Sequence, residues 1–190
     1  KKILLVTKPS ISKFLSRLDF CPDGPENLDD FLKMVELAKK IKKNNSENIR
    51  FRFLNDNWNN KKQIGSFKID DQSSYDESLK NTKIVISSYL LTPFSESVTN
   101  GIPSICLLNK EKWIFNKKFK PLITEMKKNK ILFFSSIECA KHINKHYDVI
   151  YEWWHSQKVM STIIKFQNHV YYLNKNKKIE EWSNFIKPKN

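Results

Sequence analysis

The sequence predicts an α/β domain with a mostly parallel sheet of about six strands flanked by helices. Short apolar runs alternate with stretches of helical periodicity, which is the pattern of strands joined by helical crossovers. The chain has only 3 glycines and no internal repeat, so it is neither a low-complexity nor a repeat protein. No apolar run reaches the length of about 18 residues that a membrane-spanning helix needs.

The predicted strands are short apolar runs, which in chain order occupy residues 3–7, 49–54, 66–69, 83–88, 103–108 and 131–134. Helical periodicity predicts helices at residues 28–43, 74–81, 93–100, 118–129, 136–147 and 148–173, the last one broken near His155-Ser156. The crossover between 83–88 and 103–108 is short. We therefore expect these two strands to lie side by side in the sheet.

We expect one structural unit with two parts. Residues 1–147 form the sheet domain, and residues 148–190 form a C-terminal helical arm with a basic tail. The chain begins with Lys1 rather than Met, and its first residues already have the pattern of a strand. A natural start rarely opens in this way, so the sequence indicates a piece cut from a longer protein.

The cysteines indicate a reduced, cytoplasmic protein. Cys21, Cys106 and Cys139 are widely and irregularly spaced, and they form neither a CxxC pair nor a disulfide framework. Cys106 lies within an apolar run and is expected to be buried as a small hydrophobe. The first segment also lacks the apolar core and the cleavage site of a signal peptide.

The chain is strongly basic, with a formal net charge of +14. This charge suits nucleic acid, an anionic lipid surface or a phosphate-bearing ligand, although lysine-rich surfaces are often simply solvated. Arginine occurs only at positions 17, 50 and 52, and no recognisable RNA- or DNA-binding motif is present. We therefore predict no tight binding to nucleic acid. The anionic inner face of a membrane remains a possible partner, which the domain would contact peripherally.

The stretch that points to chemistry is residues 87–103. Thr92 has the character of a helix N-cap, and Pro93 that of a first helical residue. The N–H groups of residues 94–96 would then face the crevice at the strand ends, where nucleotides bind in open α/β sheets. The carboxylate of Glu96, which only accepts hydrogen bonds, suits the paired hydroxyls of a ribose.

This stretch resembles the donor-binding motif in the C-terminal domain of GT-B glycosyltransferases. Thr92-Pro93-Phe94-x-Glu96, with Asn100-Gly101-Ile102-Pro103-Ser104-Ile105-Cys106, is similar to a family of transferases from bacterial O-antigen and surface-polysaccharide gene clusters. Arg52 at the end of a strand, Trp113, and the pair Trp153-Trp154 agree with that family. The similarity covers about residues 49–175.

The resemblance implies a Rossmann-like domain that binds the nucleotide of an activated sugar as a substrate, with no cofactor and no metal. The implied donor-binding residues are Ser87, Ser88, Thr92, Pro93, Phe94, Ser95, Glu96 and Arg52. Members of that family are longer, and their N-terminal acceptor domain, which is expected to hold the general base, is missing here. The catalytic residues are therefore not assigned, and the isolated half is expected to be inactive.

Several of these residues also have simpler interpretations. Arg52 ends a strand, and the sequence equally allows a plain ion pair with Asp56 or Asp70. Thr-Pro followed by a Glu within the first turns is a common helix start. Trp153 and Trp154 are expected to pack in the core rather than to stack on a ligand.

One further helix face carries groups that can bind metal. Glu138, His142 and His146 fall four residues apart, but no further ligand accompanies them. Ala140 and Ile143 define the buried face of this helix, so we expect the two histidines to lie on its solvated side.

Two other functions stay open from the sequence alone. A nucleotide-sugar epimerase of similar architecture shares the Ser–Glu–Pro pattern, and the lysine clusters at 110–130 and 174–189 suit a nucleic-acid-binding module. Neither G-x-G-x-x-G nor G-x-x-x-x-G-K-[ST] occurs, which argues against a glycine-cradled NAD or ATP.

Overall fold

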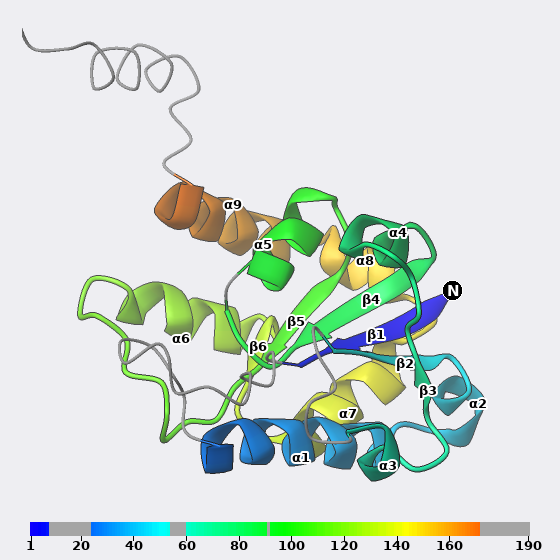
Figure 1. The fold of residues 1–190 in the computed structure, drawn as a ribbon. Coiled ribbons are helices and arrows are strands. Elements are labelled where there is room, and N and C mark those ends of the chain that lie inside the picture. Colours follow the sequence, from blue (N-terminus) through cyan, green and yellow to red (C-terminus); the bar gives the residue numbers. More distant parts are fainter. Residues whose placement is uncertain (8–23, 54–59, 91, 172–190) are drawn as a thin grey trace, which may run out of the picture.

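The computed structural model describes residues 1–7, 24–53, 60–90 and 92–171. Six strands form one sheet in the order β3-β2-β1-β4-β5-β6, and every neighbouring pair is parallel (Figure 1). The strands are β1 Lys2–Val6, β2 Ile49–Arg52, β3 Lys68–Ile69, β4 Thr82–Ser87, β5 Ser104–Leu107 and β6 Leu132–Phe133. The predicted fold class is confirmed, and β4 and β5 are neighbours as expected.

The helices follow the predicted periodicity closely. They are α1 Gly24–Lys40, α2 Lys43–Ser46, α3 Asn60–Gln63, α4 Tyr75–Lys80, α5 Thr92–Thr99, α6 Lys120–Lys128, α7 Ser136–His146, α8 Ile150–Trp154 and α9 Gln157–Tyr171. The expected break near 155–156 separates α8 from α9. The short helices α2 and α3 were not predicted, because four residues are too few to show a helical period.

Side chains alternate between the two faces of the sheet, and each face has its own helices. Ile3 and Leu5 of β1 lie in a core cluster with residues of α1 and α7. Leu4 and Val6 point the other way and pack with Leu79 of α4. The helices α5, α6 and α9 cover the same side near β5 and β6, so the sheet lies between two helical layers (Figure 1).

The C-terminal helices pack closely on this sheet. Phe166 of α9 is fully buried, and its ring meets that of Phe94 in α5 edge-on, with centroids 5.2 Å apart. Ile150 belongs to the core on the α1 side, whereas Trp154 belongs to the core on the α9 side. The helix α8 therefore crosses from one face of the sheet to the other, and Trp154 packs as the sequence predicted.

The prediction that His142 lies on a solvated face is wrong. Its side chain is buried and lies against Trp153 and Phe133, with ring centroids 4.8 and 5.6 Å away. The reason is tertiary, since the helix α8 folds back so that Trp153 covers a face that α7 alone would expose. Burial, with smaller effects from His146 and nearby lysines, lowers the pKa of His142 to about 4.

Three further observations bear on function. Cys106 is fully buried, as predicted, and Cys139 is also buried, in the core on the other face of the sheet. Across the described residues, no group of three or more His, Cys, Asp or Glu side chains is placed to hold a metal ion. None of the helices in this part of the chain combines the length and the apolarity needed to cross a bilayer.

The packing of α9 predicts a large loss of stability for Phe166→Ala. Removing a fully buried ring that contacts Phe94 should lower the free energy of unfolding by about 3–5 kcal/mol. The matched control is Ile164→Ala in the same helix, where the side chain is 51% exposed and the loss should stay within about 0.5 kcal/mol. Urea unfolding followed by circular dichroism measures both, and equal losses would show that α9 is not part of the core.

Candidate functional site

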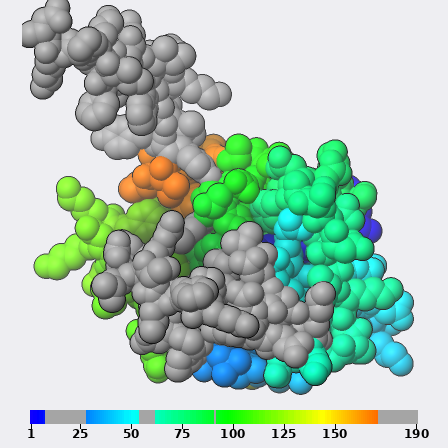
Figure 2. Space-filling view, viewed as in Figure 1, coloured from blue at the N-terminus to red at the C-terminus, as the bar shows by residue number. Residues whose placement is uncertain are grey.

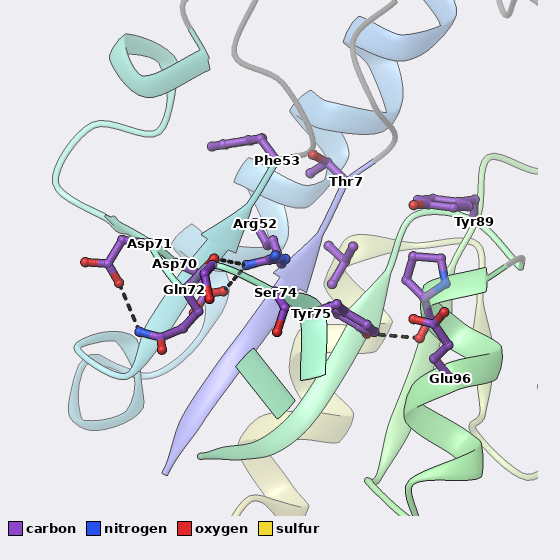
Figure 3. A pocket seen from close by; sticks show the side chains of 13 residues that line it. Thr7, Arg52, Phe53, Asp70, Asp71, Gln72, Ser74, Tyr75, Tyr89 and Glu96 are labelled. Carbon is purple, nitrogen blue, oxygen red and sulfur yellow. Dashed lines mark hydrogen bonds and ion pairs between the residues drawn. The ribbon is translucent and has the colours of Figure 1, made fainter. Parts of the chain in front are cut away.

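A polar pocket of about 590 Å³ lies at the carboxyl ends of the strands (Figure 3). Its walls come from the ends of β1 and β2, from the β3–α4 connection, from Tyr89 after β4, and from the first turns of α5. The lining residues are Val6, Thr7, Arg52, Phe53, Asp70, Asp71, Gln72, Ser73, Ser74, Tyr75, Tyr89, Pro93 and Glu96.

The topology of the sheet explains why the pocket forms there. From β1 the strand order runs to β2 and β3 on one side and to β4, β5 and β6 on the other. The strand order therefore changes direction between β1 and β4, and the pocket lies at the carboxyl ends of these strands. In open α/β sheets, ligands bind in a crevice outside the carboxyl ends of the strands.

One wall is held by a buried carboxylate, that of Asp70 directly after β3. Its side chain is only 2% exposed, and it forms ion pairs with Lys2 and with Arg52, whose Nη1 lies 2.8 Å from Oδ2. The hydroxyl of Ser78 in α4 donates to the same oxygen. Burial alone would raise the pKa of Asp70, but the hydrogen bonds from Lys2, Ser78 and Arg52 outweigh it and lower that pKa.

Asp70 in turn fixes Arg52 in the pocket wall. Nη1 of Arg52 also donates to the carbonyl oxygen of Gln72 at 3.1 Å and to the hydroxyl of Ser78 at 2.8 Å. Two cations, Lys2 and Arg52, share the carboxylate of Asp70, and Arg52 is the cation that lines the pocket, beside the carboxylates of Asp70, Asp71 and Glu96. A fixed guanidinium in such a wall suits an anionic ligand.

The opposite wall is the start of α5. The hydroxyl of Tyr75 in α4 donates to the carbonyl oxygen of Pro93 at 2.9 Å and so ties the two walls together (Figure 3). Glu96 lies one turn into the helix, with its carboxyl group at the pocket and its side chain exposed. Burial and the nearby Glu96 raise the pKa of Tyr89 to about 12, and burial likewise raises that of Tyr75, so both stay neutral hydrogen-bonding groups.

Three of the predicted donor-binding residues line the pocket together, namely Arg52, Pro93 and Glu96. Thr92 is the first residue of α5 rather than its N-cap, so the helix begins one residue earlier than predicted, and the side chain of Thr92 is exposed. Arg52 forms the ion pair with Asp70 that the sequence allowed and also faces the pocket. Asp56 lies outside the described residues.

The other four predicted residues are buried around the pocket rather than in its lining. Ser87 and Ser88 are fully buried, and the hydroxyl of Ser87 donates to the carbonyl oxygen of Tyr89 at 2.7 Å, which holds the turn after β4. Phe94 is fully buried in the core, and Ser95 is 7% exposed. These residues position the pocket walls.

Thr7 is a pocket residue that sequence reasoning did not select. It follows β1 and is 4% exposed, and its hydroxyl has no hydrogen-bond partner in the described part of the chain. A buried hydroxyl left unpaired costs stability, and such groups call for an explanation by a ligand or a functional role. The available signal was a polar residue at the end of an apolar strand, next to the crevice.

The sheet order defines a Rossmann-like α/β fold, and the polar pocket lies at the ends of its strands. In the comparison with protein families, a sequence model described as LIC12162 family transferase matches residues 1–186. The chain therefore belongs to the LIC12162 family of transferases. Searches of curated proteins and of solved structures found no match.

The Asp70 network predicts that Asp70→Asn destabilises the fold strongly. Replacing the carboxylate leaves Lys2 and Arg52 without their buried counter-charge, which should cost about 3–5 kcal/mol at neutral pH. Because the pKa of Asp70 is lower in the folded protein than its usual 3.8, its contribution is complete above that value and is lost as the pH falls through the folded pKa.

Thermal melts between neutral and strongly acidic pH test this prediction. The wild-type melting temperature should fall more steeply below about pH 4 than that of Asp70→Asn. Asp71→Asn is the control, because Asp71 is the exposed neighbour and its loss should change stability by no more than about 0.5 kcal/mol. Parallel acid profiles for wild type and Asp70→Asn would contradict the role given to Asp70.

Proposed function

We propose that this domain binds the nucleotide of an activated sugar and serves as the donor-binding half of a glycosyltransferase for bacterial surface polysaccharide. The observation that carries the proposal is the pocket itself, which brings Glu96, Arg52 and the start of α5 together at the strand ends. Membership in a transferase family supports it. The resemblance of residues 87–103 to the donor-binding motif of GT-B enzymes supports the choice of donor.

Each part of the pocket suits one part of a nucleotide sugar. The carboxylate of Glu96 suits the two hydroxyls of the ribose, since it accepts from both. The guanidinium of Arg52 and the positive end of α5 suit the phosphate groups. The pocket volume of about 590 Å³ falls within the range of about 300–1,000 Å³ that is usual for small-molecule sites.

The same groups would assist the transfer. When the sugar leaves, negative charge grows on the nucleotide phosphate, and a cation and a helix N-terminus already in place stabilise that charge without reorganising. This is the electrostatic work that a metal ion does in other transferases. The base that deprotonates the acceptor, and the acceptor site, belong in this proposal to a further domain of the natural protein.

The proposal predicts that Glu96→Ala weakens nucleotide binding and leaves the fold intact. Loss of two charge-assisted hydrogen bonds, at about 1.5–3 kcal/mol each, should lower the affinity by about tenfold to a hundredfold for each bond lost. The side chain is exposed, so the free energy of unfolding should change by no more than about 0.5 kcal/mol. Calorimetric titration of the full natural protein with CMP, UDP and GDP measures the affinity.

Glu138→Ala on α7 is the matched control, because Glu138 is also exposed and lies in another helix. If wild type binds one nucleotide and Glu96→Ala binds it equally well, Glu96 is not the ribose anchor. If wild type binds none of the three, the proposed function is wrong. Conversion of the bound nucleotide sugar without any acceptor would point to an epimerase instead.

The buried hydroxyl of Thr7 gives a second prediction within the same pocket. Thr7→Val keeps the shape of the side chain and removes a hydroxyl that has no partner among the described residues, so stability should stay the same or rise by up to about 1 kcal/mol. If the ligand satisfies that hydroxyl, affinity should fall by about three- to tenfold. Melting curves and the same titrations measure the two effects.

Thr162→Val is the control, in which stability rather than affinity should change. Thr162 is buried, and its hydroxyl donates to the carbonyl oxygen of Lys158 at 2.8 Å, far from the pocket in α9. This change should lower stability by about 1 kcal/mol and leave affinity unchanged. A Thr7→Val protein that loses stability but keeps its full affinity would show that Thr7 has a structural role alone.

A further inference from the structure

The segment between β5 and α6 presents an apolar side chain to solvent. Ile114 is 97% exposed, the highest value among the large exposed hydrophobic side chains of the described residues. A single aliphatic side chain fully in water is unfavourable, at about 25 cal/mol per Å² of apolar surface. We refer to residues 109–119, which connect the two elements, as the Ile114 loop.

The loop is held in place by its own aromatic residues. The ring of Trp113 stacks on that of Phe115 at 5.9 Å, and Phe115 stacks on Phe119 at 6.3 Å. Phe119 in turn meets the ring of His169 in α9 at 5.8 Å. The flanking rings are therefore partly buried, whereas the side chain of Ile114 between them is exposed to solvent.

Exposed lysines lie close to Ile114 in the sequence. Lys110, Lys117, Lys118 and Lys120 are all exposed, and none of them forms a salt bridge within the described residues. Residues 110–130 contain eight lysines against two glutamates, and one of these, Glu125, is paired with Lys165. Figure 2 shows this yellow-green part of the chain projecting from one edge of the molecule. The loop thus combines one exposed apolar side chain with a local excess of positive charge.

We propose that the Ile114 loop docks the domain on an anionic lipid bilayer. Ile114 enters the boundary between headgroups and acyl chains, and the lysines around it contact anionic headgroups. An apolar side chain with basic neighbours is the combination that binds such surfaces, through apolar burial and electrostatic attraction together. This proposal is independent of the nucleotide-binding function.

The chemistry of the loop favours a bilayer over two other partners. Protein interfaces have extended apolar centres and are depleted in lysine, whereas this loop has one apolar side chain among many lysines. Single-stranded nucleic acid binds on exposed aromatic platforms, but Trp113, Phe115 and Phe119 are turned toward each other and toward α9.

Docking through this loop would also orient the pocket. The loop leaves the carboxyl end of β5, and the pocket lies at the carboxyl ends of β1 to β4, so both are on the same edge of the parallel sheet. The bilayer would therefore lie beside the pocket-bearing edge of the sheet, with the amino ends of the strands away from it.

Vesicle sedimentation with the full chain tests the proposal. Wild type should bind vesicles that contain phosphatidylglycerol, should not bind vesicles of phosphatidylcholine alone, and should bind more weakly at high salt. Ile114→Asp should lower the partition coefficient by at least about tenfold. The double variant Lys117→Glu/Lys118→Glu should lower it by about fivefold or more for each lysine.

The control is Val149→Asp, which adds the same charge at another exposed aliphatic side chain, 41% exposed, beyond α7. It should bind like wild type, and thermal melts should show that all variants are folded. The proposal is overturned if wild type does not bind anionic vesicles or if Ile114→Asp binds them as well as wild type. It is also overturned if a single-stranded oligonucleotide binds more tightly than the vesicles and Ile114→Asp does not change that binding.

Discussion

The buried carboxylate of Asp70 connects the fold to the site. It forms ion pairs with Lys2 at the start of β1 and with Arg52 at the end of β2, and it accepts a hydrogen bond from Ser78 in α4. The edge strand β3 has only two residues, so backbone pairing alone attaches it weakly, and this network secures it. A buried charge that loses one partner costs several kcal/mol, so the strand edge and the Arg52 side of the pocket are fixed together.

The parts of the fold that were predicted correctly are those with strong local patterns. The strands β4 and β5 and the helix between them follow from two apolar runs, a Thr-Pro helix start and a Gly-Ile-Pro turn. The predictions that failed depended on contacts between segments far apart in the sequence. The periodicity of α7 identified one buried face of that helix, but only the fold shows that Trp153 covers His142 on a second face. The choice between Asp56 and Asp70 as the partner of Arg52 likewise needed the position of β3.

The candidate site was predictable on the α5 wall, and on the opposite wall only Arg52 was selected. Glu96 and Pro93 belong to a continuous motif, so they could be selected together, whereas Thr7, Asp70 and Tyr75 come from three separate elements. A parallel sheet gathers such residues at the ends of its strands, and no spacing in the sequence records this. The sequence also does not show which hydroxyls shape a turn, as that of Ser87 does by donating to the carbonyl oxygen of Tyr89.

The pocket walls are held by interactions that form without any ligand. The bond from Tyr75 to the carbonyl oxygen of Pro93 sets the start of α5 relative to α4, and the raised pKa of Tyr75 keeps that hydroxyl protonated. Arg52 is held in position by its ion pair with Asp70. The hydroxyl of Thr7 has no partner among the described residues, and the carboxylate of Glu96 is exposed at the pocket. A preorganised pocket loses little freedom on binding, so these two groups can serve recognition without a cost to the fold.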